Sequence, residues 1–336
     1  MKARRSLPTF LLLMSMLLPA GFAAADPPER TKVRIMNSPY MSWAVIHLAK
    51  ANGCFDDLGI DVEFVTMRGI REGLPALAQG RLDVLPGFIT PGYVNLMQRG
   101  AGIRIVADKG YMEAEGCPYR AFLASRELVA SGRLDSFEGL RGLRIAGERT
   151  STSYYALSSL LRAGNLTEDD IEWIDLPTPA KQGALEAGAV DIVNASEPWI
   201  TRIVQSGAGV IWLPARDVVP GFQHSFLMFG PSLLEKDREA GMKFMVGYLR
   251  GVRIYNEGKT DHNVRVIAGE TGLEETLVRD ACWPPIRSTG EYDTESLLTY
   301  QSWAFEEGLI DGLVPVEGFW DPAFIEYANR VLAEEH

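Results

Sequence analysis

The sequence predicts an α/β protein of two lobes followed by a helical C-terminal region. Short runs rich in β-branched and aromatic residues alternate with helical runs, which favours mainly parallel sheets with helices on their faces. This alternation occurs in two blocks, and the chain crosses between them near Tyr119 and again near 222–226. The 336 residues suffice for two domains, and a hydrophobic content of 46% with a mean hydropathy of −0.02 is typical of a soluble globular protein.

The first block is expected to contain four strands and three helices. The strands are predicted at 32–36, 60–67, 82–89 and 103–110, and the helices at 40–53, 71–80 and 91–100. Asp83 begins one of these strands and Asp191 begins a strand of the second block, both in a "G-x-x-D"-like context, and we expect both to serve the fold.

The second block repeats the theme and then returns to the first. Its strands are predicted at 118–125, 140–147, 171–176, 190–195 and 210–214, and its helices at 151–164, 179–188 and 196–207. A strand over 224–230 begins the return, and amphipathic runs such as 240–258 and 293–310 predict a helical tail. One lobe is therefore expected to comprise 26–118 with 224–336 and the other 119–223, with a cleft between them that closes on a small ligand.

The first 25 residues have the pattern of a secretory signal peptide. Lys2, Arg4 and Arg5 precede the apolar run 10–23, and the small residues 23–25 provide a cleavage site near Ala25. The run is shorter than the roughly 20 apolar residues that a membrane span needs. Export to the periplasm is therefore expected, with an uncleaved anchor as the alternative.

The charge of the chain argues against polyanionic partners. The formal net charge is −11, and it becomes −14 without the signal peptide, which carries three positive charges and no acid. Such a chain is a poor match for nucleic acid or anionic membranes. A small anionic ligand remains compatible, because it responds to local dipoles and charges.

The three cysteines and four histidines give no sign of a metal or redox site. Cys54, Cys117 and Cys282 are far apart and none belongs to a C-x-x-C pair. At most one disulfide can form, and we expect all three to be small buried apolar residues. The histidines show no metal-ligand spacing, so neither a metal nor a cofactor is expected.

Four predicted strand ends are followed by the same kind of segment. Each has hydroxyl or amide residues able to cap a helix, then a helix start with an aromatic ring in its first turn. The segments are "NSPYMSW" from Asn37, with Pro39 expected at the first helical position, "FITPGY" from Phe88, "TSTSYY" from Thr150 and "SEPW" from Ser196. Two of them fall in each lobe.

These segments predict a binding cleft. In an open α/β sheet ligands bind at the carboxyl ends of the strands, where helix N-termini attract anions and aromatic rings can sandwich a planar group. Glu197 can either complement its helix dipole or pair with a ligand amino group, and Arg120 can be a solvated charge or a ligand contact. The candidate ligand-binding residues are Asn37, Ser38, Tyr40, Trp43, Phe88, Thr90, Tyr93, Arg120, Thr150, Ser151, Thr152, Ser153, Tyr154, Glu197 and Trp199.

Several stretches resemble the substrate-binding proteins of bacterial ABC importers. They are "HLAKANGCFDDLGIDVEFV", "LAQGRLDVLPG", "DSFEGLRGLRIAG", "LLRAGNLTEDDIEWIDL" and "ALEAGAVDIVNASEPW", and the resemblance over about 31–330 is greatest to the NMT1/THI5-like group. It implies a type 2 periplasmic-binding fold, a hinge, ligand contacts from the four segments above, a permease and an ATPase as partners, and a monomeric protein. Members of the group bind nitrate, sulfonates, taurine or thiamine pyrimidine precursors. The aromatic set favours a planar heteroaromatic ligand, whereas the hydroxyl-rich turn Thr150–Ser153 favours a sulfonate or other small anion. Of the two we expect the planar heteroaromatic, such as a thiamine pyrimidine precursor.

Two alternatives to transport remain. Fungal pyrimidine-synthesis enzymes resemble the same group, but they carry a cysteine-rich "CCCFC" segment that this chain lacks and they are intracellular. A periplasmic sensor that docks on a receptor would share every feature above. Neighbouring genes for a permease and an ATPase would distinguish transport from sensing.

Overall fold

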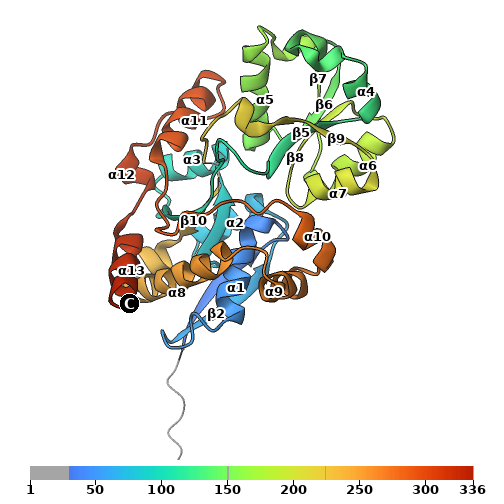
Figure 1. The fold of residues 1–336 in the computed structure, drawn as a ribbon. Coiled ribbons are helices and arrows are strands. Elements are labelled where there is room, and N and C mark those ends of the chain that lie inside the picture. The colour runs from blue at the N-terminus through green and yellow to red at the C-terminus, as the bar shows by residue number, and fades with distance from the viewer. Residues whose placement is uncertain (1–29, 150, 224, 336) are drawn as a thin grey trace, which may run out of the picture.

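Two mixed β-sheets, each flanked by helices, form two lobes that lie one above the other (Figure 1). The computed structural model describes residues 30–149, 151–223 and 225–335; the predicted signal peptide lies outside them. The α/β two-lobe prediction is confirmed. Among the described residues no helix combines the length and apolarity needed to cross a membrane.

The sheet of the first lobe, called lobe 1, has the strand order β2-β1-β3-β10-β4. Its strands are β1 Thr31–Asn37, β2 Ile60–Thr66, β3 Val84–Phe88, β4 Arg104–Gly110 and β10 Ser225–Phe229. Lobe 2 has the order β7-β6-β8-β5-β9. Its strands are β5 Arg120–Ala124, β6 Arg144–Gly147, β7 Glu172–Asp175, β8 Ile192–Ser196 and β9 Val210–Pro214.

Each sheet is mainly parallel, as expected, but it is mixed: four of its five strands run in the same direction and one runs against them. β10 runs antiparallel to both β3 and β4, and β5 runs antiparallel to both β8 and β9. β5 and β10 are each the first strand after the chain crosses from one lobe to the other. Each therefore runs opposite to the other strands of its sheet. The predicted boundaries at 118/119 and 223/224 stay a prediction; they fall between β4 and β5 and just before β10.

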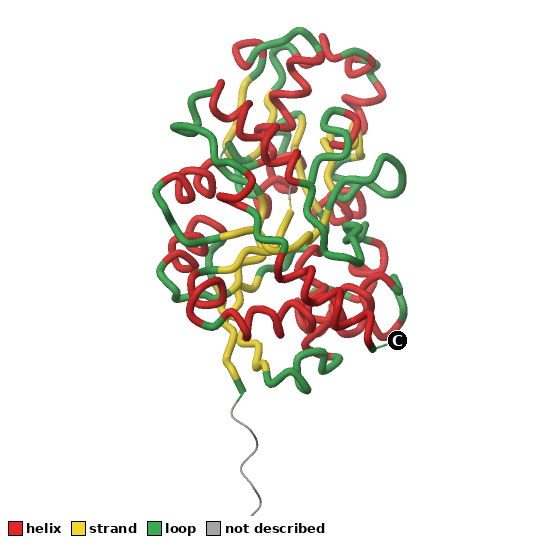
Figure 2. Tube along the Cα trace, turned by 90° about the vertical axis from the view of Figure 1, so that its left-hand side faces the viewer, coloured by secondary structure: helices red, strands yellow, loops and turns green. Residues whose placement is uncertain are grey.

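Helices cover both faces of each sheet, as Figure 2 shows. Before β10 they are α1 Ala44–Ala51, α2 Ile70–Ala78, α3 Pro91–Gln98, α4 Arg126–Ala130, α5 Thr152–Ala163, α6 Lys181–Glu186 and α7 Trp199–Ser206. The predicted helical tail is confirmed as α8 Arg238–Asn256, α9 Asp261–Thr271, α10 Glu275–Asp280, α11 Thr294–Glu306, α12 Val316–Phe319 and α13 Ala323–Glu334. One apolar cluster packs against α8 and α13, and another runs continuously from lobe 1 into lobe 2.

An Arg–Asp pair fixes the start of a strand in each lobe. Asp83 accepts hydrogen bonds from the backbone and side chain of Arg34, and Asp191 accepts the equivalent bonds from Arg144. These contacts tie the beginning of each strand to its parallel neighbour. The prediction that both aspartates serve the fold is confirmed.

The C-terminal region reaches across to lobe 2. Trp303 on α11 donates its indole N–H to Ser158 on α5 at 2.9 Å, and its ring contacts Tyr154 and Tyr155. Asn95 on α3 of lobe 1 donates to the carbonyl of Leu309 just after α11. Helix α11 therefore bridges the lobes, although the sequence placed it within lobe 1.

A disulfide fixes the first crossing. Cys117 and Cys282 are joined, with 5.7 Å between their Cα atoms, which is the single disulfide that three cysteines allow. Cys282 is buried as expected, whereas the expectation of a buried residue is wrong for Cys117, which is exposed. Cys54 is free and buried, as expected. The bond attaches the crossing segment to the loop after α10, and Tyr111 also donates its backbone N–H to Pro285 in that loop.

Candidate functional site

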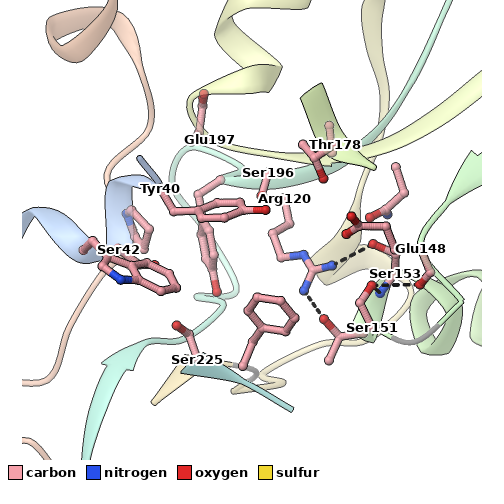
Figure 3. Close-up of a pocket in the computed structure, with 17 residues that line it drawn as sticks. Tyr40, Ser42, Arg120, Glu148, Ser151, Ser153, Thr178, Ser196, Glu197 and Ser225 are labelled. Atoms are coloured by element: carbon pink, nitrogen blue, oxygen red, sulfur yellow. Dashed lines mark hydrogen bonds between the residues drawn. The ribbon is translucent and has the colours of Figure 1, made fainter. Parts of the chain in front are cut away.

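A pocket lies between the lobes at the carboxyl ends of β1, β3, β6 and β8 (Figure 3). It encloses about 540 Å³ of space between atoms, including its open mouth. Lobe 1, the two crossings and the loop after α10 contribute Tyr40, Ser42, Trp43, Phe88, Tyr119, Ser225 and Pro284, and lobe 2 contributes Arg120, Glu148, Ser151, Thr152, Ser153, Thr178, Asn194, Ala195, Ser196 and Glu197. Closure of the lobes therefore surrounds the pocket with polar groups on one side and rings on the other.

Arg120 is a buried cation at the centre of this pocket. It is only 8% exposed, at the start of β5, and it donates hydrogen bonds to the hydroxyls of Thr152 and Ser153. Among the residues that the structure describes, its Nε has no hydrogen-bond partner. Burial lowers the pKa of the guanidinium from its ordinary value, although an arginine stays charged. Both partners are neutral hydroxyls, and the Glu148 carboxylate acts on the guanidinium only through space, so an anion can pair with Arg120 directly.

The N-terminus of α5 adds to this positive potential. Ser151 is its N-cap and accepts a hydrogen bond from the backbone N–H of Ser153, as the sequence predicts. Because the Thr152 and Ser153 hydroxyl oxygens accept from Arg120, their own protons are available to donate to a ligand. A helix N-terminus with hydroxyl donors is a favourable environment for an acid group.

A second buried cation lies directly behind the pocket lining. The Lys181 ammonium is 1% exposed and donates to the Asn194 carbonyl at 2.7 Å and to the Thr178 hydroxyl at 3.4 Å. Burial lowers its pKa to about 8, although the nearby Glu148 carboxylate opposes that shift. Lys181 therefore carries a positive charge at neutral pH and loses it at mildly alkaline pH.

Aromatic rings close the other side of the pocket and span the two lobes. The Tyr40 ring of lobe 1 lies 4.8 Å from the Trp199 ring of lobe 2 and 5.4 Å from the Trp43 ring, centroid to centroid. Burial and the Glu148 charge raise the Tyr40 pKa to about 12, whereas a hydrogen bond between Tyr40 and Thr178 on lobe 2 acts to lower it. Tyr40 thus joins the lobes through both its ring and its hydroxyl.

The pocket continues into a wider outer groove. The two share Tyr40, Trp43, Phe88, Glu148 and Ser151, and the groove comprises about 1360 Å³ of space, open solvent included. The groove is further lined by Met36, Ser38, Pro39, Met67, Arg68, Gly69, Ile70, Arg71, Asp175, Pro177, Pro179 and Trp199. A ligand can therefore place an acid group near Arg120 and a larger, partly apolar portion outside it.

The structure brings most of the predicted residues to this cleft. The inner pocket is lined by Tyr40, Trp43, Phe88, Arg120, Ser151, Thr152, Ser153 and Glu197, and the outer groove adds Ser38 and Trp199. Thr150 lies outside the described residues. That these residues bind the ligand stays a prediction.

Four of the predicted residues lie outside both pockets. Asn37 contacts His47 at 3.1 Å, and Thr90 caps α3 by accepting from the backbone N–H of Tyr93. Tyr93 is fully buried and packs on Phe226. Tyr154 points toward lobe 2 and α11, where its hydroxyl donates to Glu168 at 2.5 Å and its ring contacts Trp173 and Trp303.

Two of the four predicted helix caps differ from expectation. Asn37 and Ser38 do not cap the first helix, because the 3₁₀ helix η1 Met41–Trp43 begins after Tyr40 without a side-chain cap. Pro39 precedes it and is not the first helical residue. At the fourth segment the N-cap of α7 is Pro198, after a cis peptide bond, and the Glu197 carboxylate accepts from the Thr201 backbone N–H. A carboxylate beside the first turn replaces the expected Ser196 cap.

The Glu197 carboxylate supports the structure, although the residue lines the pocket. Besides Thr201 it accepts a hydrogen bond from the backbone N–H of Cys282 at 3.0 Å. Burial raises its pKa from the ordinary glutamate value, although these hydrogen bonds act to lower it. With its oxygens bound in this way, Glu197 links α7 to the loop after α10.

The sequence analysis did not identify several polar residues of the cleft. Glu148 is a half-buried acid beside the cations, and Asn194 and Thr178 are buried in the lining. Asn194 is the second-last residue of the predicted strand "VDIVNA", and Glu148 directly follows "LRIAG". Both therefore lie at or near a strand end, where ligands are expected to bind. Lys181 gave no such signal, because it lies within a helix.

Comparisons with known proteins identify the family. The model of the NMT1-like family matches residues 26–269. The chain belongs to the NMT1-like family. No curated protein matches the sequence.

Solved structures show that this family member has the fold of import components and also of an enzyme. A ligand-binding component of an ABC-type import system from Staphylococcus aureus is 14% identical, with a TM-score of 0.74 over 90% of this chain and 100% of that chain. The alkanesulfonate-binding protein SsuA from Xanthomonas axonopodis pv. citri, bound to MOPS, is 15% identical, with a TM-score of 0.68 over 88% and 99%. The desulfurization enzyme DSZB is 14% identical, with a TM-score of 0.66 over 90% and 100%. At these identities the likeness concerns the fold.

Proposed function

We propose that this NMT1-like protein is the substrate-binding component of an ABC importer and that it captures a small organic acid between its lobes. Arg120 carries the proposal, since it is a buried cation that faces the cleft and is bound to neutral hydroxyls. An acid group there would neutralise the charge and accept hydrogen bonds from the guanidinium and from the Thr152 and Ser153 hydroxyls. The import proteins of the same fold support the transport function.

The outer groove sets the rest of the ligand. Its lining combines Met36, Met67 and Ile70 with the Trp199 ring, so it can contact an apolar or aromatic portion. Of the two ligand classes that the sequence suggests, the buried cations favour the sulfonate or other small anion over the planar heteroaromatic that we expected from the sequence. A planar ring in the groove remains compatible with that choice, provided that the ligand carries an acid group.

The proposal includes the expected location and partners. The chain would be exported by its first 25 residues, act as a monomer in the periplasm and deliver its ligand to a permease driven by an ATPase. An enzyme like DSZB shares the fold. Turnover of the captured acid is therefore the alternative that an assay must address.

Binding is tested with protein that has been exported and purified from the periplasm of a producing bacterium. N-terminal sequencing should show a start near Asp26. A thermal-shift panel of alkylsulfonates, arylsulfonates, aromatic carboxylates, nitrate, aminopyrimidines and taurine identifies the class. A ligand at a thousand times its Kd adds about 4 kcal/mol, which raises the melting temperature by roughly 8 °C or more at this chain length.

The outcomes separate the alternatives. A large shift with acids, together with unchanged ligand recovered after hours of incubation, supports capture for transport. Chemical conversion of the ligand would favour the enzyme. Binding only by uncharged ring compounds would contradict the role given to Arg120.

A further inference from the structure

Asn194 on β8 has an amide group without a partner in the pocket lining. The residue is 1% exposed, yet neither its Oδ1 nor its Nδ2 has a hydrogen-bond partner among the described residues. Its backbone is engaged by the sheet, and its carbonyl accepts from Lys181, so the side chain alone is unsatisfied. Buried amides in proteins nearly always have partners, which makes this one a candidate ligand contact.

The chemistry of the amide defines what it can recognise. Its oxygen accepts a hydrogen bond and its nitrogen donates one, in a single plane. The complementary group therefore presents a donor and an acceptor side by side. A ureido group, a primary carboxamide and an amino-substituted ring nitrogen all have this arrangement.

Asn194 is close to the proposed acid-binding group. β5 and β8 are antiparallel, with Arg120 opposite Ser196 and Phe122 opposite Asn194. Residues directly opposite each other on two paired strands point to the same side of the sheet. Arg120 and Asn194 are therefore diagonal neighbours on one face, and the Cα atoms of such neighbours are about 7–8 Å apart. A single small molecule can reach both side chains.

We propose that Asn194 determines specificity, and that the ligand is an acid that carries a donor–acceptor group two or three bonds from its acid group. The inference rests on the proposed function, because Arg120 is the anchor for the acid. The half-buried Glu148 carboxylate in the same lining provides a further acceptor for an N–H of that group. A plain alkyl acid would leave the Asn194 amide buried and unpaired, which is a strong basis for discrimination.

Matched probe pairs test this by isothermal titration calorimetry. In one pair 2-ureidoethanesulfonate is compared with 4-methylpentane-1-sulfonate, and in the other 3-ureidopropanoate is compared with 5-methylhexanoate. Each pair keeps the acid and the overall shape but replaces the ureido group by an isobutyl end. We expect the ureido member to bind about tenfold more tightly or better in at least one pair.

Variants assign the preference to one side chain. Asn194→Leu, which is similar in size, should reduce the affinity ratio within that pair to about one or below, and Asn194→Asp should reduce it because the Nδ2 donor is lost. Asn95→Leu is the matched control, because Asn95 lies on α3 outside both pockets. That variant should keep the wild-type ratio.

The possible failures are distinguishable. If no acid binds to the wild-type protein, the proposed function and this inference both fall. If acids bind but neither pair shows a preference, or the preference survives in Asn194→Leu, only this inference is overturned. A preference for taurine over both ureido acids that persists in Asn194→Leu would assign the selection to Glu148 and would also overturn it.

Discussion

Replacing Arg120 by methionine should affect ligand binding and stability in different ways. The substitution removes a cation that is 8% exposed and replaces it with an unbranched apolar chain. In the ligand complex the lost group is one partner of a buried charge pair, for which truncation costs about 2–5 kcal/mol. At 1.4 kcal/mol for each factor of ten, Kd should rise between about 30-fold and several thousand-fold.

The same change should leave the stability of the ligand-free protein nearly unchanged or increase it. Without a ligand Arg120 is a buried charge whose hydrogen bonds go to two neutral hydroxyls, and burying such a charge opposes folding. The loss of those two hydrogen bonds acts in the other direction. The two effects therefore nearly cancel, whereas the effect on binding does not.

Calorimetric titration gives the affinity, and urea denaturation without ligand gives the free energy of unfolding. Arg162→Met is the matched control, because Arg162 lies on α5 but is exposed, and its ion pair with Glu307 spans 4.0 Å. The control should change neither quantity appreciably. If Arg120→Met binds the acid as well as the wild type does, or if it lowers stability by as much as it weakens binding, Arg120 is a structural residue and the reasoning fails.

Further predictions address three other parts of the molecule, namely Lys181, the disulfide and Tyr154. Ligand affinity should fall as pH rises through about 8, because the Lys181 ammonium loses its proton there, and calorimetry at pH 7 and pH 9 should show a weaker pH dependence in Lys181→Met. The pKa of Lys181 in the folded protein is below the usual lysine value, so between about pH 8 and pH 10 the unfolded chain binds more protons than the folded one. The free energy of unfolding of the ligand-free protein should therefore rise with pH in that window, relative to Lys181→Met. A free energy that falls with pH relative to Lys181→Met would contradict this. Replacing Cys117 and Cys282 together by serine should lower the free energy of unfolding by about 2–5 kcal/mol in urea titrations. Cys54→Ser is the control, and mass spectrometry should show that it leaves the disulfide intact. Equal unfolding curves for the double variant and the wild type would refute a stabilising crosslink. Tyr154→Ala should cost about 3–5 kcal/mol of stability because the ring packs on Trp173 and Trp303, and a variant of normal stability that fails to bind would instead place Tyr154 in the ligand site.

Aromatic residues show which part of the site the sequence predicted. Tyr40 and Trp199 precede or begin their helices and line the cleft, whereas Tyr93 and Tyr154 are each the third residue of a helix and lie outside both pockets. Successive residues of a helix are rotated by about 100°, so a ring two or three positions further along projects in a different direction. The sequence marked the right strand ends but could not select among the rings there.

The polar groups of the pocket depended still more on tertiary structure. Arg120 could be read from the sequence as a solvated charge, and only its burial beside Thr152 and Ser153 distinguishes it from the many surface arginines. Lys181 comes from a short helix whose sequence gives no sign of a cleft. Desolvation and neighbouring charge give these groups their chemistry, and both arise from segments that meet only in the folded chain.

By itself the sequence determined the α/β class, the order of the strands and helices along the chain, the two crossings and the family resemblance. These depend on hydrophobic periodicity and turn residues, which act over a few neighbouring positions. Only the tertiary structure decided that β5 and β10 run antiparallel within their sheets, that Cys117 pairs with Cys282, and that Arg120 and Asn194 share one face of lobe 2. Strand pairing and burial join residues that are distant in the sequence, so no local pattern specifies them.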